Sequence, residues 1–380
     1  MMGEIEKERE MIRAAAAKAA QKVVQPLAAA IDATGEFPWE LVDAFGKQGL
    51  LSILLPEEYG GTDGNITSFS SVIEEIAKVS GSSSLLILAH GVGTLPIWWR
   101  GNPSQKETYF TQISEKNHLT TLALTEAGAG PDLASLTTTA KKEGKDYVLN
   151  GRKSFITHGS IAHLYSVFAV TDPALGAKGI SAFVVEDGTP GLRFGKREEK
   201  IGMRGSVTTD VIFENCRIPQ ENRLGEEGEG WMIAGHTLHR ARPAVGALAV
   251  GIAQGALDYA LRYANERIQF KKPISSFQAI QFMIADMATQ IEAARSLVYD
   301  TAAQIDAGVE GLEKLSAITK CFASEVAMRV TTDAVQILGG YGYMKDYPVE
   351  RMMRDAKVTQ IYGKPNQAER LFIVQQLLKG

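Results

Sequence analysis

The sequence predicts a multidomain α and β protein with three parts. These are an N-terminal all-α domain, a central β-barrel or β-sandwich domain and a C-terminal four-helix bundle. Two changes in hydrophobic period along the 380 residues support this prediction. Apolar residues recur at helical spacing in 1–118, alternate with a period near two in 119–227, and return to helical spacing in 228–380. The length agrees with two or three domains, because a domain takes about 150 residues.

The N-terminal part has the pattern of several helices. Phe69, Val72, Ile73 and Ile76 recur at a spacing that places them on one helical face. Alanine is dense in 14–20, and prolines and paired glycines separate the segments. We therefore expect a helical domain that ends near residue 118.

Strand signals fill the central part. Segments 137–139 and 147–149 flank a polar turn, which predicts a hairpin. Further β-branched and aromatic runs occupy 165–170, 180–185 and 207–213, with Gly, Pro and Asp between them. Turns at this frequency are typical of a barrel or a sandwich.

The C-terminal part contains four long helical patterns, at 244–267, 278–303, 312–338 and 367–378. Arg242-Pro243 precedes the first of them, and proline suits the first turn of a helix. Four antiparallel helices of this length form a bundle.

Charge and cysteine usage exclude several classes of protein. Lys and Arg total 40 against 44 Asp and Glu, a net charge of −4, so we expect no nucleic-acid partner. The two cysteines, Cys216 and Cys321, are far apart, which argues against a disulfide framework or a zinc site. His236 and His239 have no nearby third ligand, so we expect no metal.

No segment has the pattern of a membrane span or a secretory signal. The most apolar stretch, 85–99, is interrupted by His90 and Pro96 and is shorter than the ~20 residues that a span needs. The N-terminal 13 residues are rich in charges of both signs. The expected location is the cytoplasm.

Two motifs of the central part suit a flat, phosphate-bearing ligand. The segment T-E-A-G-A-G-P-D from Thr125 has two glycines that let backbone amides approach a ligand. Phe155-Ile156-Thr157 combines an aromatic ring with a hydroxyl donor. Each segment alone also fits a purely structural strand-to-turn connection.

Two motifs of the C-terminal part occur at helix ends. Glu266-Arg267 with Phe270 follows the first long helix, and Gln336-Ile337-Leu338-Gly339-Gly340 ends a later one. An arginine binds pyrophosphate well, and a double glycine permits close backbone approach or simply stops a helix.

Together, in this order, the motifs resemble those of the acyl-coenzyme A dehydrogenase family of flavoproteins. The resemblance covers nearly the whole chain and includes 277–281, 348–351 and 354–357. It implies non-covalent FAD between the β-domain and the C-terminal bundle, an acyl-CoA substrate and a homotetramer. It also implies that electrons pass to an electron-transfer flavoprotein.

The resemblance assigns residues to three groups by matched position. The isoalloxazine ring is expected to contact Leu124, Thr125, Gly130, Phe155, Ile156 and Thr157. The pyrophosphate and adenosine, mostly across a subunit interface, are expected to contact Arg267, Gln269, Phe270, Gln278, Gln336, Gly339 and Gly340. The acyl-CoA is expected to contact Pro131, His239, Arg242, Tyr362 and Gly363.

The sequence departs from the family at the catalytic base. The family's glutamate belongs where this chain has Gly363, in Ile361-Tyr362-Gly363. A minority of members carry it one residue before the arginine, where this chain has Ala241. Neither side chain can take a proton, so ordinary α,β-dehydrogenation lacks its usual base.

Three explanations remain open. In the first, His90 on an N-terminal helix is a relocated base that serves a 1,4-dehydrogenation of an unsaturated or alicyclic acyl-CoA, although a packing role for His90 is equally open. In the second, the chain is a lyase of the desulfinase type, against which Ser82-Ser83-Ser84 counts because an arginine is expected there. In the third, it is a catalytically inactive FAD- and CoA-binding subunit.

Overall fold

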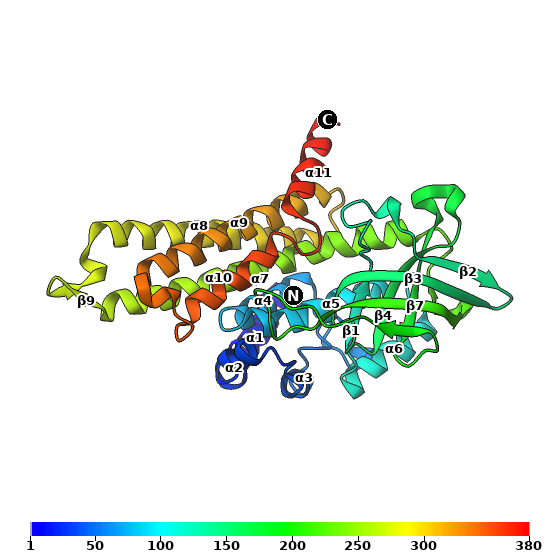
Figure 1. Cartoon of the computed structure of the whole chain (residues 1–380), viewed down its shortest axis with the longest axis horizontal. Helices are drawn as coiled ribbons and strands as arrows, with labels where there is room; N and C mark the ends of the chain where they lie inside the picture. Colours follow the sequence, from blue (N-terminus) through cyan, green and yellow to red (C-terminus); the bar gives the residue numbers. More distant parts are fainter. Residues whose placement is uncertain (1, 380) are drawn as a thin grey trace.

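The computed structural model describes residues 2–379 and places the sheet at one end of the molecule, beside the N-terminal and C-terminal helices (Figure 1). The N-terminal helices are α1 (Met2–Ala19), α2 (Ala28–Thr34), α3 (Trp39–Gly46), α4 (Ile66–Ala77), α5 (Gly81–Arg100) and α6 (Pro103–Lys116). Asn65, Ser80 and Asn102 cap α4, α5 and α6, since each side chain accepts a hydrogen bond from a backbone N–H of the first turn.

The central part forms one eight-stranded sheet with the order β6-β7-β3-β2-β4-β5-β8, and β1 pairs with β4 in parallel. The strands are β1 (Thr120–Ala123), β2 (Thr139–Glu143), β3 (Asp146–Thr157), β4 (Leu164–Val170), β5 (Ile180–Glu186), β6 (Leu192–Phe194), β7 (Thr208–Pro219) and β8 (Arg223–Leu224). The predicted hairpin is present as β2 and β3, which pair in antiparallel register around Gly144 and Lys145.

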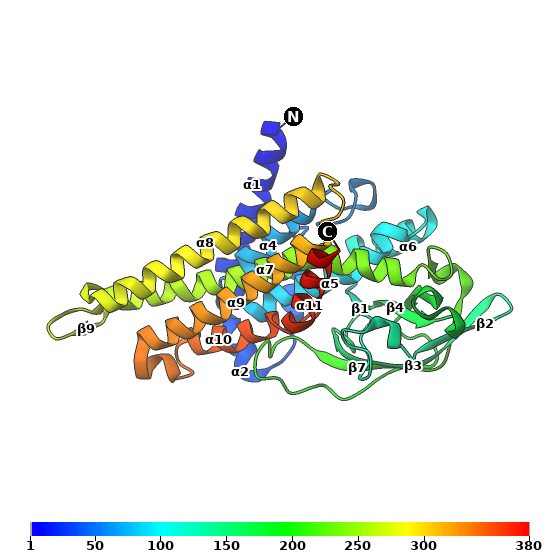
Figure 2. The same ribbon diagram turned by 90° about the horizontal axis from the view of Figure 1, so that it is seen from above.

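The C-terminal helices are α7 (Gly230–Glu266), α8 (Gln278–Asp306), α9 (Glu313–Leu338), α10 (Pro348–Thr359) and α11 (Asn366–Leu378). A short hairpin of β9 (Ile268–Gln269) and β10 (Lys272–Pro273) joins α7 to α8. Helices α7 to α10 run alongside one another, whereas α11 projects from the body of the molecule (Figures 1 and 2). The three-part fold predicted from the sequence is confirmed, and the domain limits at 118 and 227 stay predictions.

Two details of the C-terminal part differ from the prediction. Helix α10 was not predicted, and α7 begins at Gly230 rather than near residue 244, so Pro243 lies inside the helix instead of in its first turn. Proline lacks the N–H that would bond the carbonyl of His239, four residues earlier. The buried Ser316 hydroxyl of α9 donates to that carbonyl at 2.7 Å, which replaces the missing bond and lets the helix continue.

Helix α7 joins the domains. A Cβ at Gly251 or Gly255 would lie 2.4 Å from the Glu74 carbonyl oxygen or 2.0 Å from that of Lys78, so glycine is required for α7 to approach α4. By length and composition α7 could cross a membrane, but 78% of its most apolar window is buried inside the fold. It is the central helix of the core, and it positions the residues of the site described next.

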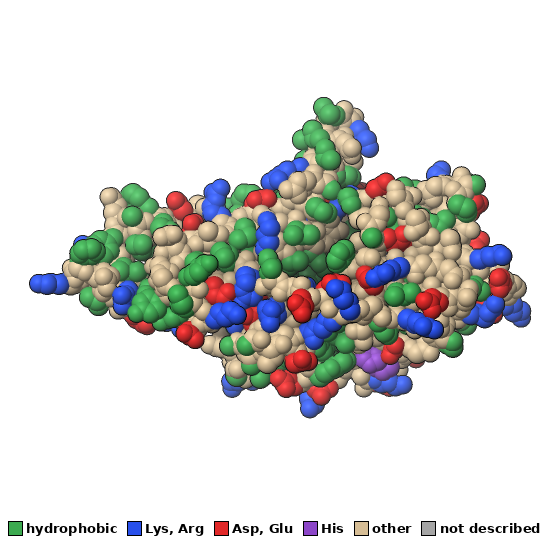
Figure 3. All heavy atoms as spheres, in the orientation of Figure 1, with side chains coloured by type: hydrophobic (Ala, Val, Ile, Leu, Met, Phe, Trp, Pro, Cys, Tyr) green, Lys and Arg blue, Asp and Glu red, His purple; other side chains and the backbone are tan. Residues whose placement is uncertain are grey.

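Charges of both signs share the surface. Lys and Arg side chains lie beside Asp and Glu side chains along the middle of the face shown in Figure 3. This mixture agrees with the small net charge of −4.

Candidate functional site

A central cavity of about 380 Å³ lies where the sheet, α5, α7 and the loop between α10 and α11 meet. Its size falls in the range of small-molecule sites, ~300–1,000 Å³. Predicted residues that line it are Leu124, Thr125, Gly130, Pro131, Phe155, Ile156, Thr157, Ala241, Arg242, Tyr362 and Gly363. The sequence analysis did not predict Lys200, Lys320 and Glu369, which also line it.

A bulge in β3 presents Phe155 at the mouth of this cavity. The pairing of β3 with β7 shifts register between Lys153 and Ile156, and Phe155 adopts φ +58° with its side chain 67% exposed. An exposed aromatic residue in a left-handed conformation is unusual, and such strain clusters at functional sites. The bulge is held in place because the Ser154 N–H donates to the Thr125 carbonyl at 2.8 Å.

A buried ion pair supports the loop that carries Thr125 and Gly130. The Lys153 ammonium, fully buried, donates to Glu126 Oε1 at 2.7 Å and to the Leu124 carbonyl at 3.2 Å. Glu126 also accepts from the backbone N–H groups of Thr137 at 2.8 Å and Thr138 at 3.0 Å. Burial is the largest single influence and raises the pKa of Glu126. The charge and hydrogen bond of Lys153, together with the hydrogen bonds from Thr137 and Thr138, outweigh it and lower that pKa to about 2.

The glycines of this loop are not required by packing. A Cβ at Gly128 or Gly130 would meet nothing within 4 Å, and neither residue needs a positive φ. Gly130 lines the cavity, where the lack of a side chain lets a ligand reach the backbone. With the aromatic ring of Phe155 and the hydroxyls of Thr125 and Thr157, this lining fits a flat heteroaromatic ring such as isoalloxazine.

His90 does not line the cavity. On α5 the cavity-facing residues are Leu85, Ala89 and Val92, and His90 points to another face. Its Nε2 donates to the Leu51 carbonyl at 2.8 Å and its Nδ1 accepts from the Thr120 N–H at 3.1 Å. Burial lowers its pKa to about 4. With both ring nitrogens bonded to the backbone, His90 has a structural role and is not a candidate for the base.

His239 also lies outside the cavity. Its side chain is buried, and burial lowers its pKa to about 4. The part of His239 that the structure uses is its carbonyl, which accepts the Ser316 bond described above. The expectation that its ring contacts acyl-CoA has no support from this geometry.

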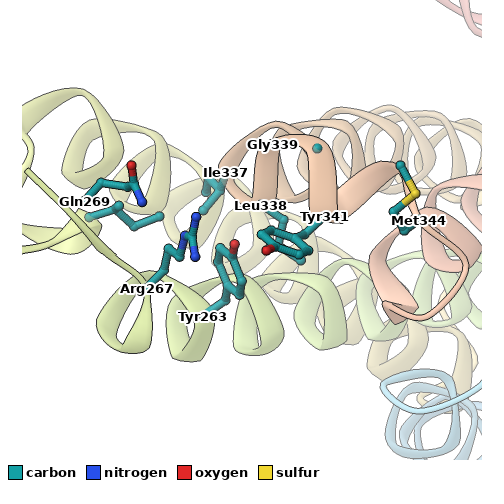
Figure 4. A pocket seen from close by; sticks show the side chains of 10 residues that line it. Tyr263, Arg267, Gln269, Ile337, Leu338, Gly339, Tyr341 and Met344 are labelled. Atoms are coloured by element: carbon teal, nitrogen blue, oxygen red, sulfur yellow. The ribbon is translucent and has the colours of Figure 1, made fainter.

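A second cavity of about 430 Å³ lies at the far end of α7, beside the β9–β10 hairpin. Arg267 and Tyr263 point toward Tyr341 (Figure 4), and the Arg267 guanidinium lies 5.2 Å from the centre of the Tyr341 ring. Gly339 has φ +60° and no neighbour within 4 Å of a built Cβ, so its backbone is open to a ligand. A cation beside an aromatic ring and an open glycine suits a phosphate-linked base.

The predicted adenosine residues divide into two sets around this second cavity. Arg267, Gln269, Gly339 and Gly340 line it, whereas Phe270, Gln278 and Gln336 are exposed and do not. Since Arg242 and Tyr263 lie 21 residues apart on α7, the two cavities are about 30 Å apart along the helix.

Comparison with known proteins agrees with this geometry. Family models described as the N-terminal, middle and C-terminal domains of acyl-CoA dehydrogenase match residues 6–117, 121–216 and 228–378. An acyl-CoA dehydrogenase of Bacillus subtilis is 46% identical over 99% of both chains. Cyclohex-1-ene-1-carbonyl-CoA dehydrogenases of Syntrophus aciditrophicus and Geobacter metallireducens are each 48% identical, over 99% and 94% of this chain and 91% and 95% of their own.

Solved structures agree as well. Butyryl-CoA dehydrogenase from Megasphaera elsdenii is 42% identical with a TM-score of 0.95, over 98% of both chains. A chain in a structure of the electron transferring flavoprotein of Acidaminococcus fermentans is 47% identical with a TM-score of 0.96, over 98% of both. An acyl-CoA dehydrogenase complexed with FAD from Bacillus anthracis is 33% identical with a TM-score of 0.91, over 98% of this chain and 66% of its own.

These names do not favour a lyase or an inactive subunit, the two alternatives that the sequence left open. The chain belongs to the acyl-CoA dehydrogenase family and is an FAD-dependent oxidoreductase that acts on the CH–CH group of an acyl-CoA thioester.

Proposed function

We propose that this enzyme dehydrogenates an acyl-CoA whose acyl group is alicyclic and already unsaturated, of the cyclohex-1-ene-1-carbonyl-CoA class, by a 1,4-elimination. The observation that carries the proposal is the 48% identity, over 99% of this chain, to a relative named for that substrate. Gly363 and Ala241, which stand at the two positions where relatives carry the base, line the central cavity. They support the proposal because neither side chain can accept the proton that ordinary α,β-dehydrogenation removes.

The residues of the central cavity have separate roles in this proposal. FAD, when bound, supplies the oxidant that accepts a hydride. Phe155 covers the mouth, while Thr125 and Thr157 offer hydroxyls to the ring edge. The apolar residues Leu85 and Val92 exclude water from the acyl group.

Further residues of the two cavities serve the substrate and the rest of FAD. Pro131 and Tyr362 contact the thioester end of the substrate. At the second cavity, Arg267, Gln269 and Gly339 hold the pyrophosphate and adenosine of FAD. Phe270, Gln278 and Gln336 are exposed, so they act in this proposal only on a ligand shared with another subunit.

We also propose a homotetramer that transfers electrons to an electron-transfer flavoprotein in the cytoplasm. The separation of the two cavities along α7 supports an assembly in which one subunit's second cavity serves its neighbour. Exposed apolar side chains on the projecting α11 support it too, with Leu371 63%, Leu377 60% and Leu378 82% exposed (Figures 1 and 3). The similarity to a chain in an electron transferring flavoprotein structure supports the partner.

The test is anaerobic mixing of the purified holoenzyme with three thioesters, cyclohex-1-ene-1-carbonyl-CoA, cyclohexane-1-carbonyl-CoA and butyryl-CoA. We expect the flavin absorbance to bleach fastest with the unsaturated alicyclic ester. Faster bleaching by butyryl-CoA would contradict the proposed substrate class and leave the family activity intact.

A further inference from the structure

The cavity that lacks the usual base contains one other carboxylate. Among the described residues that line the central cavity, Glu369 is the only acidic one, and none is a histidine. Its side chain is 1% exposed. Glu369 is therefore the one carboxylate among these lining residues that could accept a proton.

The fold places Glu369 in the same cavity lining as Gly363 and Ala241, the two positions where relatives carry the base. It lies in the first turn of α11, six residues after Gly363. Arg242, the residue after Ala241 on α7, donates to Glu369 from Nε at 2.9 Å and from Nη2 at 2.7 Å. The two-point contact fixes the direction of the carboxylate as well as its position.

The surroundings pair this carboxylate with a cation and shield it from bulk water. Arg242 provides a permanent positive charge, and each carboxylate oxygen accepts one hydrogen bond from it. An ionised carboxylate has about four lone-pair sites, so capacity remains on both oxygens for a proton from a bound ligand.

Lys320 is less suited to the same role. It is buried on α9 and lines the cavity, and its ammonium donates to the Lys364 carbonyl at 2.7 Å and to Asn366 Oδ1 at 2.8 Å. Burial lowers its pKa to about 8, so at neutral pH it stays mostly protonated and has no lone pair to accept a proton. Its two contacts hold the start of α11, and with it Glu369, against α9.

We propose that Glu369 is the catalytic base of this enzyme, an inference that rests on the proposed function. An acyl C–H bond next to the existing double bond breaks, and the proton passes to a Glu369 oxygen. The electron pair of that bond forms a double bond to the nearer carbon of the existing double bond, whose own electron pair moves on to form a second double bond to the carbon that loses the hydride. A hydride leaves a second acyl carbon for the bound FAD, so the acyl group loses two hydrogens and the flavin gains two electrons. Arg242 acts as a positioning residue for the carboxylate.

The test compares three holoenzymes in anaerobic flavin reduction by cyclohex-1-ene-1-carbonyl-CoA. For Glu369→Gln we expect a reduction rate about 10²–10⁴-fold lower, with FAD content and thioester affinity, measured by titration, unchanged. The matched control is Glu325→Gln, which alters a 45% exposed carboxylate that contacts Asn366 and Arg370 outside the cavity and is expected to keep the wild-type rate. A Glu369→Gln rate within about tenfold of wild type would overturn the proposal.

A second variant covers the case in which Glu369→Gln does not fold. Glu369→Asp keeps the charge beside Arg242 but shortens the reach, so we expect slower reduction with normal FAD content. A wild-type rate in Glu369→Asp would overturn the proposal. If butyryl-CoA alone reduces the wild-type flavin, the proposed substrate class is wrong. The ratio of the wild-type rate to the Glu369→Gln rate, measured with butyryl-CoA, then still decides whether Glu369 is the base. If no thioester reduces it, both proposals fail.

Discussion

Replacing Lys153 by methionine removes the buried positive charge that supports the loop at the central cavity. Lys153 is fully buried and Glu126 is 5% exposed, so the substitution leaves a carboxylate in the interior without its ionic partner. Breaking one side of a buried pair costs about 3–5 kcal/mol of stability. Because Glu126 also binds the Thr137 and Thr138 N–H groups, the strain falls on the loop that carries Thr125 and Gly130.

The assay is thermal unfolding followed by circular dichroism, with FAD release followed by flavin fluorescence in the same samples. For Lys153→Met we expect a lower unfolding temperature and earlier loss of FAD. The control is Arg217→Met, which breaks a half-exposed pair with Glu143 and Asp146 on the same sheet and is expected to cost less than about 1 kcal/mol. Equal losses in the two variants, or a Lys153→Met protein that holds FAD like wild type, would refute the argument.

Three other substitutions test separate parts of the structure. Gly363→Glu places a carboxylate where a built Cβ meets nothing within 4 Å, so we expect the variant flavin to be reduced faster by butyryl-CoA. The backbone φ of +73° makes this substitution cost about 1–2 kcal/mol of stability. No faster reduction would contradict the assignment of this position to the family's base. His90→Ala removes two backbone contacts, so we expect a lower unfolding temperature but an unchanged rate per bound FAD; a rate loss like that of Glu369→Gln would restore His90 as a base. Burial raises the pKa of Asp355 to about 6 although the Met203 N–H donates to its carboxylate. The folded state therefore binds a proton at Asp355 more tightly than the unfolded state does. The stability that this proton contributes is present below the unfolded pKa of Asp355 and is lost as pH rises through about 6. The unfolding temperature of wild type relative to Asp355→Asn is therefore expected to fall between about pH 4 and about pH 7, by the equivalent of ~3 kcal/mol, and a constant difference would contradict this.

Local sequence signals were sufficient for most of the fold. Hydrophobic period and turn residues predicted strands that overlap β2, β3, β4, β5 and β7 and the helices α8, α9 and α11, but not the short strands β1, β6 and β8. Helix α10 also carries a signal that could have found it, because Pro348 stands at its first position and Val349, Met352 and Ala356 share one buried face. The start of α7 had no such signal, because the bond from Ser316 that lets the helix pass Pro243 comes from another helix.

The site was predictable only where its residues adjoin in sequence. The Thr125 loop and the Phe155 segment were found because each is a short motif. Glu369 was missed because its partner Arg242 is 127 residues away, and only the packing of both α11 and α7 against α9 brings them together. His90 was proposed as a base because the sequence predicts that it lies on a helix but not which face of that helix lines the cavity.

The most direct test of this account is the product of a single anaerobic turnover. The wild-type holoenzyme is mixed with one equivalent of cyclohex-1-ene-1-carbonyl-CoA, and the acyl-CoA is analysed by mass spectrometry and NMR while the flavin absorbance is recorded. The account predicts a conjugated diene that has lost two hydrogens for each flavin reduced. An acyl-CoA of unchanged mass beside an oxidised flavin would contradict it.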